Sequence, residues 1–289
     1  SIGVSKEAGF GITLGGLINI ALYPLFMFVI MPAGQEILAV GIATLISNCI
    51  SCAYFFAVIY KIRRNSVIRF NLKQGLPAKD SIISIFNVGL PAAVGTLLFD
   101  IDYIVIGKLM SSYNDIAMAA MGIVLKAERL PLNVGIGLCQ GMMPIVAYNY
   151  AAKKEKRIND TIKYSLLIGL IVSGFSIILY EIFAKAIMNV FISEAQTIAL
   201  GTTFLRVRVL ATPLMFSSFF TVFLFQGLGE GNKALFLGIM RWAVFNIPML
   251  FILNYFIGMN GIVWSQVIAD LLTVSLSYYV YWKYKMKVK

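Results

Sequence analysis

The chain has 289 residues, of which 60% are hydrophobic and only 13% are charged. A soluble domain is closer to half apolar and a quarter charged, so this composition excludes an ordinary soluble domain and indicates a polytopic membrane protein. The net charge of +11 would suggest a nucleic-acid partner in a soluble protein, but its distribution along the chain favours a different explanation.

Eight long apolar stretches, separated by short polar joints, fill the chain almost from end to end. Each has about 20 residues or more, the length that a helix needs to cross a bilayer. The backbone groups of a spanning segment must be satisfied within the protein, which permits helices or closed barrels, and the alternating pattern of barrel strands is absent. We therefore predict an all-α polytopic membrane protein with about eight transmembrane helices. In chain order these are Phe10–Pro32, Ile37–Tyr60, Ile82–Met110, Ile116–Tyr148, Thr161–Val190, Ile198–Gln226, Ala234–Ile257 and Ile262–Trp282.

The basic residues gather in alternate joints between these spans. Six lie between Lys61 and Lys79, five between Lys153 and Lys163, and four in the tail Lys283–Lys289, whereas the joints Ala33–Glu36 and Ser111–Asp115 carry none. Loops rich in Lys and Arg stay on the cytoplasmic side of a membrane. The pattern predicts a multi-pass protein of the cell membrane (plasma or inner), with both ends of this chain in the cytoplasm. The bilayer, rather than nucleic acid, is its expected partner.

Two parts of the chain resemble each other loosely. The segments Gly3–Phe28 and Gly229–Phe251 both run from Gly, Lys and Ala residues through an Asn and a Pro to Phe. Internal repeats of this kind are common in transporters. If the first two spans pair with the last two, the first repeat shows only its end. We predict that residues 1–60 are the last two helices of an N-terminal six-helix lobe, 61–80 a cytoplasmic basic linker, and 81–289 a complete C-terminal six-helix lobe. Four more helices of the same protein are then expected ahead of residue 1.

Charged side chains inside a span are costly and need a reason. The third span carries Asp100 and Asp102, and the fourth carries Lys126, Glu128 and Arg129. The two spans are antiparallel, and both clusters fall at a similar depth, so three carboxylates should lie near two cations. One interpretation is a structural ion-pair network that neutralises itself. The other is a proton or cation site that couples to transport, favoured by the one carboxylate in excess. Because Asp100 and Asp102 point in different directions, only one should face the interior.

Other polar and breaking residues within the spans suggest structural roles. Arg206, Arg208, Arg241 and Asp270 are expected mainly to reach the interface or a neighbouring helix end. Five prolines should interrupt and kink the spans, which suits helices that line a path; they are Pro91, Pro131, Pro144, Pro213 and Pro248.

The chain has no histidine and three cysteines. The lack of histidine removes the commonest proton shuttle and metal ligand. Cys49, Cys52 and Cys139 lie within spans and are expected to be small packing residues. Asp100 and Asp102 are badly placed to share a proton as a catalytic pair. We therefore predict that the protein is not an enzyme and has no cofactor, with a proton or a sodium ion acting only as coupling ion.

Three motifs carry a resemblance to a known family. The string Gly135-Ile-Gly137-Leu-Cys-Gln140-Gly-Met-Met-Pro144-Ile-Val-Ala-Tyr148-Asn-Tyr150 resembles the end of the eighth helix of multidrug and toxic compound extrusion (MATE) transporters. Val88-Gly-Leu-Pro91 resembles the start of their seventh helix, and Gly16-Leu-Ile-Asn19 with Pro24 their fifth. The resemblance implies twelve helices in two lobes, of which this chain would hold helices five to twelve. It also implies export of drugs or organic cations in exchange for protons or sodium ions.

The resemblance also bears on the site. It implies an acidic residue in the seventh helix near Asp100 or Asp102. Gln140, within the matching string, is a further candidate, although a hydrogen bond to a neighbouring helix would also explain it. Arg206 and Arg208 stand where one branch of the family uses acids, which puts the sodium-type site of that branch in doubt.

Three other functions compete with efflux. A flippase for lipid-linked oligosaccharides or polysaccharides shares the same helical plan and is the nearest rival. An intramembrane enzyme needs a nucleophile with a base, or metal ligands, at fixed spacing, and the sequence offers neither. A passive channel would conduct without an imposed coupling gradient.

Overall fold

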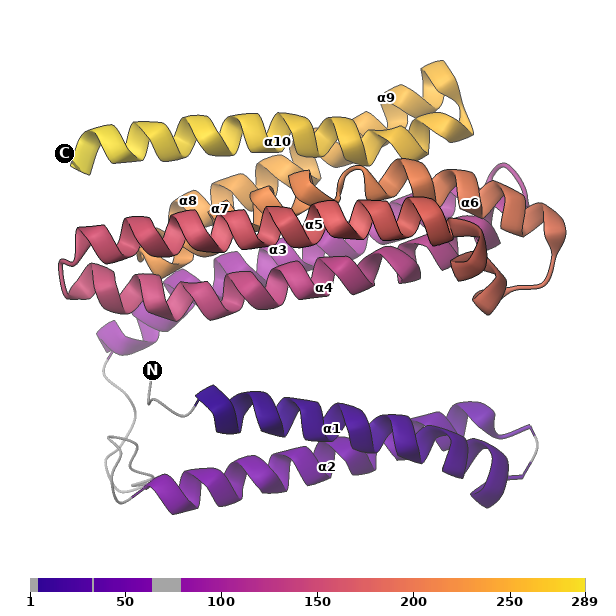
Figure 1. Ribbon diagram of the computed structural model, residues 1–289, viewed down its shortest axis with the longest axis horizontal. Coiled ribbons are helices and arrows are strands. Elements are labelled where there is room, and N and C mark those ends of the chain that lie inside the picture. The colour runs from indigo at the N-terminus through magenta and orange to yellow at the C-terminus, as the bar shows by residue number, and fades with distance from the viewer. Residues whose placement is uncertain (1–4, 33, 64–78, 289) are drawn as a thin grey trace. The chain divides into compact units, whose positions relative to one another are not determined.

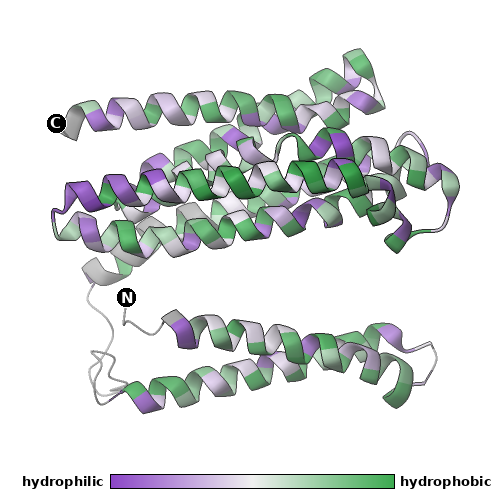
Figure 2. Ribbon diagram, in the orientation of Figure 1, coloured by the Kyte–Doolittle hydropathy of each residue, from purple (hydrophilic) through white to green (hydrophobic). Residues whose placement is uncertain are grey.

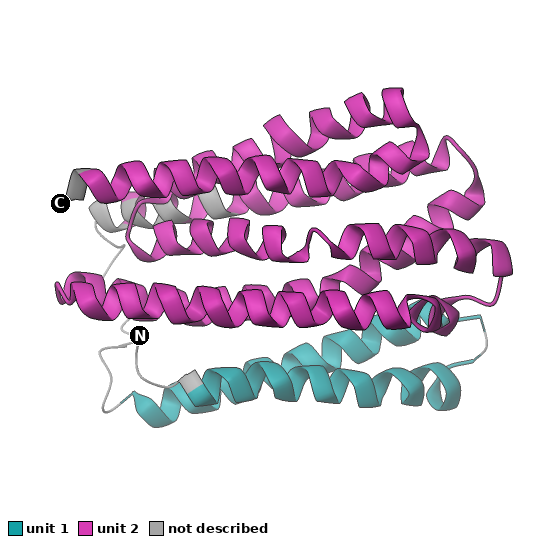
Figure 3. Cartoon of the chain, turned by 45° about the horizontal axis from the view of Figure 1, so that its top comes forward, with its two compact units in different colours: residues 1–76 teal, residues 77–289 magenta. Residues whose placement is uncertain are grey.

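The computed structural model describes residues 5–32, 34–63 and 79–288, and the described residues form helices joined by short turns, with no strand among them (Figure 1). The chain divides into two compact units, residues 1–76 and 77–289 (Figure 3). Most of the predicted linker 61–80 lies outside the described residues.

Unit 1 is a pair of antiparallel helices, α1 (Ser5–Leu25) and α2 (Glu36–Ile62), with a π-helical turn η1 (Phe26–Ile30) after α1. Its core is thin, because Gly11 of α1 and Ala39, Ala43 and Ser47 of α2 are the buried residues in the described part of this unit. Two polar contacts join the helices: the amide of Asn19 donates to Ser47 at 2.9 Å, and the hydroxyls of Tyr23 and Thr44 lie 3.1 Å apart. Hydrophobic positions predominate along both helices (Figure 2), and apolar side chains such as Ile12, Leu17 and Ile37 are exposed, as lipid contact requires.

Unit 2 is a bundle in which α4 packs extensively against α5, α6 and α7. Its outer helix α5 exposes apolar side chains such as Ile171, Phe175 and Ile182. The elements of the unit are α3 (Lys79–Ser111), α4 (Asp115–Ala151), α5 (Glu155–Phe191), α6 (Ala195–Val209), α7 (Thr212–Gly227), α8 (Gly231–Ile239), the π-helical η3 (Met240–Asn246), α9 (Ile247–Ile257) and α10 (Met259–Val288).

The predicted number of spans is supported in part. Six helical segments of the described chain are long and apolar enough to cross a membrane, and α6 with α7, bent by 46° at their junction, makes a seventh. One of the six is α8, η3 and α9 together, Gly231–Ile257. The remaining predicted span, Ile82–Met110, coincides with α3, which has 33 residues but is not among these segments. Several side chains in the first half of α3 lie outside the described residues.

The prolines act less uniformly than the sequence suggested. Pro213 follows the break between α6 and α7, and Pro248 stands near the start of α9. The prediction was wrong for α4, which continues as one helix through Pro131 and Pro144. Pro131 has no N–H to donate to the carbonyl of Ala127, four residues earlier. The buried hydroxyl of Tyr180 on α5 donates to that carbonyl at 2.8 Å, which replaces the missing bond.

Candidate functional site: a buried charge cluster

Five charged side chains are buried in the described part of the chain, and all belong to unit 2. Three are carboxylates and two are guanidinium groups, so the ionised cluster carries one negative charge in excess. A buried charge is expensive unless it is paired and hydrogen-bonded. We call these residues the buried charge cluster: Asp102 of α3, Glu128 of α4, Arg208 of α6, Arg241 of η3 and Asp270 of α10.

In the first half of the cluster, Arg208 and Glu128 form a bidentate ion pair. Arg208 donates from Nε to Glu128 Oε2 at 2.7 Å and from Nη2 to Glu128 Oε1 at 2.8 Å. This two-pronged geometry is the strongest that an Arg and a carboxylate can form. Tyr103, beside Asp102 on α3, donates its hydroxyl to Glu128 Oε1 at 3.3 Å. Glu128 therefore has partners from two other helices.

The second half of the cluster is looser. Arg241 Nη2 lies 3.0 Å from Asp270 Oδ1, but the alignment is too poor for a hydrogen bond, and both atoms lack such a partner. The guanidinium of Arg241 also lies against two aromatic rings, 4.2 Å from the centre of Phe219 and 4.4 Å from that of Trp242. Cation–π contacts of this kind compensate in part for the lost hydration.

Amide side chains connect Asp270 with Asp102. Gln266 lies one turn before Asp270 on α10 and donates to its Oδ2 at 2.5 Å. The amide nitrogen of Asn246 donates to Asp102 Oδ1 at 2.7 Å and lies 3.5 Å from Gln266 Oε1. Thus a chain of polar groups runs from α10 through η3 to α3.

Asp102 is the carboxylate of the cluster that is least completely paired. It is fully buried, and both Arg208 and Arg241 lie within electrostatic range of it, yet neither forms an ion pair with it. Its Oδ2 accepts no hydrogen bond from the described residues, and neither does the neighbouring Oδ1 of Asn246. The free Oδ2 of Asp102 is therefore available to a proton or a small cation. The described residues hold no group of three or more Asp, Glu, Cys or His side chains that would bind a metal ion.

The structure separates the residues that the sequence grouped. Asp102 and Glu128 are buried, whereas Asp100, Lys126, Arg129 and Gln140 are exposed on the surface of unit 2. The expectation that Lys126 and Arg129 would offset the carboxylates was wrong, because the cation that pairs with Glu128 is Arg208. Arg129 lies instead over the rings of Tyr103 and Phe99, at 4.8 and 5.7 Å.

Three charged members of the cluster, Arg208, Arg241 and Asp270, were assigned to peripheral roles from the sequence. The sequence nevertheless contained one indication that Asp270 is buried. Polar residues recur on α10 at helical spacing, and all of them are buried, which marks one polar face in an apolar helix: Gln266, Asp270, Thr273 and Ser277.

A family model described as MatE matches residues 91–255, more than half of the chain. The chain belongs to the MatE family. Among curated relatives, the Multidrug export protein MepA of Staphylococcus aureus is 30% identical over 273 residues, covering 93% of this chain and 58% of the relative. MepA of Staphylococcus haemolyticus is 28% identical over 263 residues, covering 91% of this chain and 57% of the relative.

Solved structures of MATE transporters share the fold. An outward-facing multidrug resistance MATE family transporter matches with a TM-score of 0.86 and 19% identity, covering 96% of this chain and 62% of that one. A MOP superfamily transporter from Pyrococcus furiosus matches with a TM-score of 0.80 and 20% identity, covering 93% and 61%. The chain therefore spans about three fifths of the length of the proteins that it matches. MatE proteins are transporters rather than enzymes, and the apolar helices place this one in a membrane.

Proposed function

We propose that this MatE-family chain works in a secondary active exporter that moves drugs or organic cations out of the cell in exchange for protons or sodium ions. The observation that carries the proposal is the buried charge cluster, with one carboxylate more than its cations inside an apolar bundle. A self-neutralising structural network would not need the extra charge. The relatives named as multidrug export proteins support the class of substrate.

Asp102 is the best candidate for the coupling site. Binding of a proton or a sodium ion at its Oδ2 would cancel the excess negative charge of the cluster. Because Arg208, Arg241 and Asn246 all lie near this carboxylate, the change would alter interactions with α6 and η3 together. Both elements are irregular: α6 ends at the 46° bend and η3 is π-helical. Ion binding at Asp102 would thus favour one conformation of α6 and η3, both of which already contain an irregular point where a helix can bend.

Export of a fluorescent cationic drug from membrane vesicles tests this proposal. The vesicles contain the protein as its cell makes it, and a proton or sodium gradient is imposed separately. Gradient-driven export is the expected result. A flippase for lipid-linked sugars would show none with either gradient, and a passive channel would release the drug without any gradient. Either of these outcomes would reject coupled efflux.

A further inference from the structure

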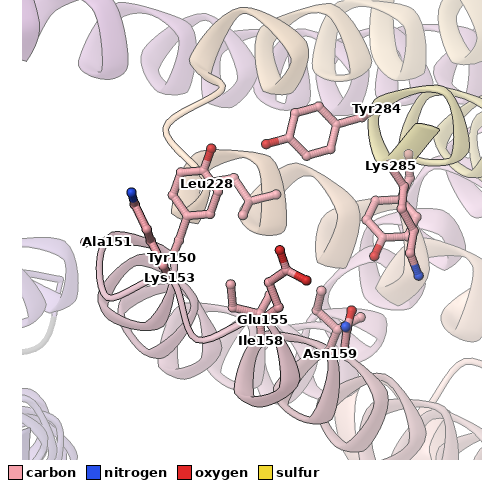
Figure 4. Close-up of a pocket in the computed structure, with 11 residues that line it drawn as sticks. Tyr150, Ala151, Lys153, Glu155, Ile158, Asn159, Leu228, Tyr284 and Lys285 are labelled. Carbon is pink, nitrogen blue, oxygen red and sulfur yellow. The ribbon is translucent and has the colours of Figure 1, made fainter. Parts of the chain in front are cut away.

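A pocket of about 690 Å³ lies within unit 2, away from the buried charge cluster (Figure 4). It is formed by the end of α4, the start of α5, Leu228 just after α7, and the last turns of α10. A volume of this size is typical of a ligand site. Ile158, Ile162 and Leu228 give it an apolar part, and Lys153 and Lys285 stand among its polar lining.

The pocket lies where α5 and α10 pack on α7 without packing on each other. Both α5 and α10 pack against α7, but in the described part of the chain they share no substantial contact with each other. On this side of the bundle, α5 and α10 are therefore separated from each other. Next to α7, Ile162 and Leu166 of α5 and Val280 of α10 are apolar and only partly buried. An apolar chain lying between α5 and α10 would continue this surface.

The surroundings of the pocket are strongly basic. Segments 150–163, 228–233 and 281–285 carry eight Lys or Arg residues against three acids. One acid, Glu230, is already paired with Lys233, and Lys233 lies 4.9 Å from the ring centre of Tyr284. Glu155 lines the pocket itself and offsets one of its two lysines. The net charge of these segments still favours an anionic ligand.

Lys153 stands in a conformation that favours glycine. Its φ is 54°, the only positive value at a non-glycine residue in the described chain. The N–H of Lys153 donates to Tyr150 O at 3.0 Å and that of Lys154 to Asn149 O at 2.9 Å, the pattern of a Schellman turn, which usually has Gly at this position. A lysine here costs stability, and an outlier of this kind points to a function for its side chain.

Tyr284 supplies a second unusual group. Its hydroxyl is buried without a well-aligned hydrogen bond, and it faces Tyr150 across the pocket (Figure 4). A buried hydroxyl without a partner is unfavourable unless something else accepts its proton. A phosphate oxygen is a strong acceptor of the kind that would satisfy it.

We propose that this pocket binds the head group of an anionic phospholipid, with the phosphate held by Lys153, Lys285 and Tyr284 and one acyl chain lying between α5 and α10. Basic pockets between transmembrane helices on the cytoplasmic side recognise such head groups. The proposal rests on the predicted cytoplasmic placement of the basic loops and not on efflux. Its test has no transport readout, so each proposal can fail without the other.

Native mass spectrometry and thermal unfolding of the purified protein test this site. The probes are dioleoyl-phosphatidylglycerol and dioleoyl-phosphatidylcholine, which share acyl chains and differ in head-group charge. We expect phosphatidylglycerol to be retained and to raise the unfolding temperature, and phosphatidylcholine to do neither. Equal effects of the two lipids would overturn the proposal. So would a matching effect of millimolar inorganic phosphate, since that would assign the site to a free anion.

Three variants refine the test. Lys153→Asn with Lys285→Gln should weaken phosphatidylglycerol binding at least roughly tenfold, and the turn should survive because Asn tolerates a positive φ. Lys163→Gln on α5, which does not line the pocket, should weaken binding much less than the double variant, because it changes only the net charge of the surroundings. Tyr284→Phe should weaken binding several-fold, because it removes a donor to the phosphate, while the lipid-free protein loses only the poorly aligned contact with Tyr150. Undiminished binding in the double variant would reject the site.

Discussion

Arg208 and Glu128 lie 80 positions apart in the sequence, and their side chains join α6 to α4 through two parallel hydrogen bonds of 2.7 and 2.8 Å. Both side chains are almost completely buried. Removing one partner would leave the other as an unpaired buried charge, whereas removing both would not. The pair therefore gives a sharp prediction about stability.

Arg208→Met or Glu128→Gln alone should lower the free energy of unfolding by about 3 kcal/mol. The double variant Arg208→Met with Glu128→Gln should recover most of that loss, because neither member of the pair is left as an unpaired buried charge. Arg206→Met is the matched control: Arg206 lies two residues away, and its pair with Glu181 at 3.5 Å is exposed, so it should cost less than about 1 kcal/mol. Thermal and denaturant unfolding of the purified variants measures all four. Additive losses in the double variant would contradict this account of the pair.

Tyr180 should stabilise α4 through the carbonyl that Pro131 leaves unbonded. Tyr180→Phe removes the 2.8 Å hydrogen bond to Ala127 O and should cost about 1–3 kcal/mol, because a buried acceptor loses its partner. In a Pro131→Ala background the backbone N–H returns, and the same substitution should cost clearly less. The comparison is a double-mutant cycle on unfolding free energy. An equal cost of Tyr180→Phe in both backgrounds would show that the hydroxyl does not serve this carbonyl.

Gly169 sets the distance between α5 and α7. A Cβ at this position would lie 1.8 Å from Cζ of the Phe216 ring, a buried side chain of α7. Gly169→Ala should therefore destabilise the protein by about 1–3 kcal/mol through overpacking. Gly174→Ala, on the same helix with no atom within 4 Å of its Cβ, should be neutral or slightly stabilising, because Ala favours a helix over Gly. The unfolding temperatures of the two variants test whether a Cβ at position 169 overpacks the contact with Phe216. Equal temperatures would mean that Phe216 moves aside freely.

The sequence predicted the helical architecture well because the apolar runs have the length that a bilayer requires. It also picked out Asp102 and Glu128, because a charge within an apolar run is visible without a structure. Helical geometry explains Lys126: at about 100° per residue it lies far around α4 from Glu128, and it is exposed. The same reasoning separates Asp100, which is exposed, from Asp102, which is buried.

The partners within the cluster could not be predicted in this way. Arg208 meets Glu128, and Asn246 meets Asp102, across 80 and 144 positions. Contacts at such separations depend on how the helices pack, and hydropathy and spacing carry no information about that packing. Arg206 and Arg208 illustrate the difficulty, since one is exposed and the other is fully buried although they stand two residues apart.

We propose that Asp102 is the carboxylate that couples ion entry to export. The most direct test is gradient-driven export of a fluorescent cationic drug from vesicles that contain the wild type, Asp102→Asn or Asp100→Asn, at matched amounts of protein in the membrane. The account predicts that Asp102→Asn loses coupled export, because the amide neither takes up a proton nor offers an anionic oxygen. Asp100→Asn, on the exposed side of the same helix, should retain it. Export by Asp102→Asn at the rate of the wild type would contradict the claim.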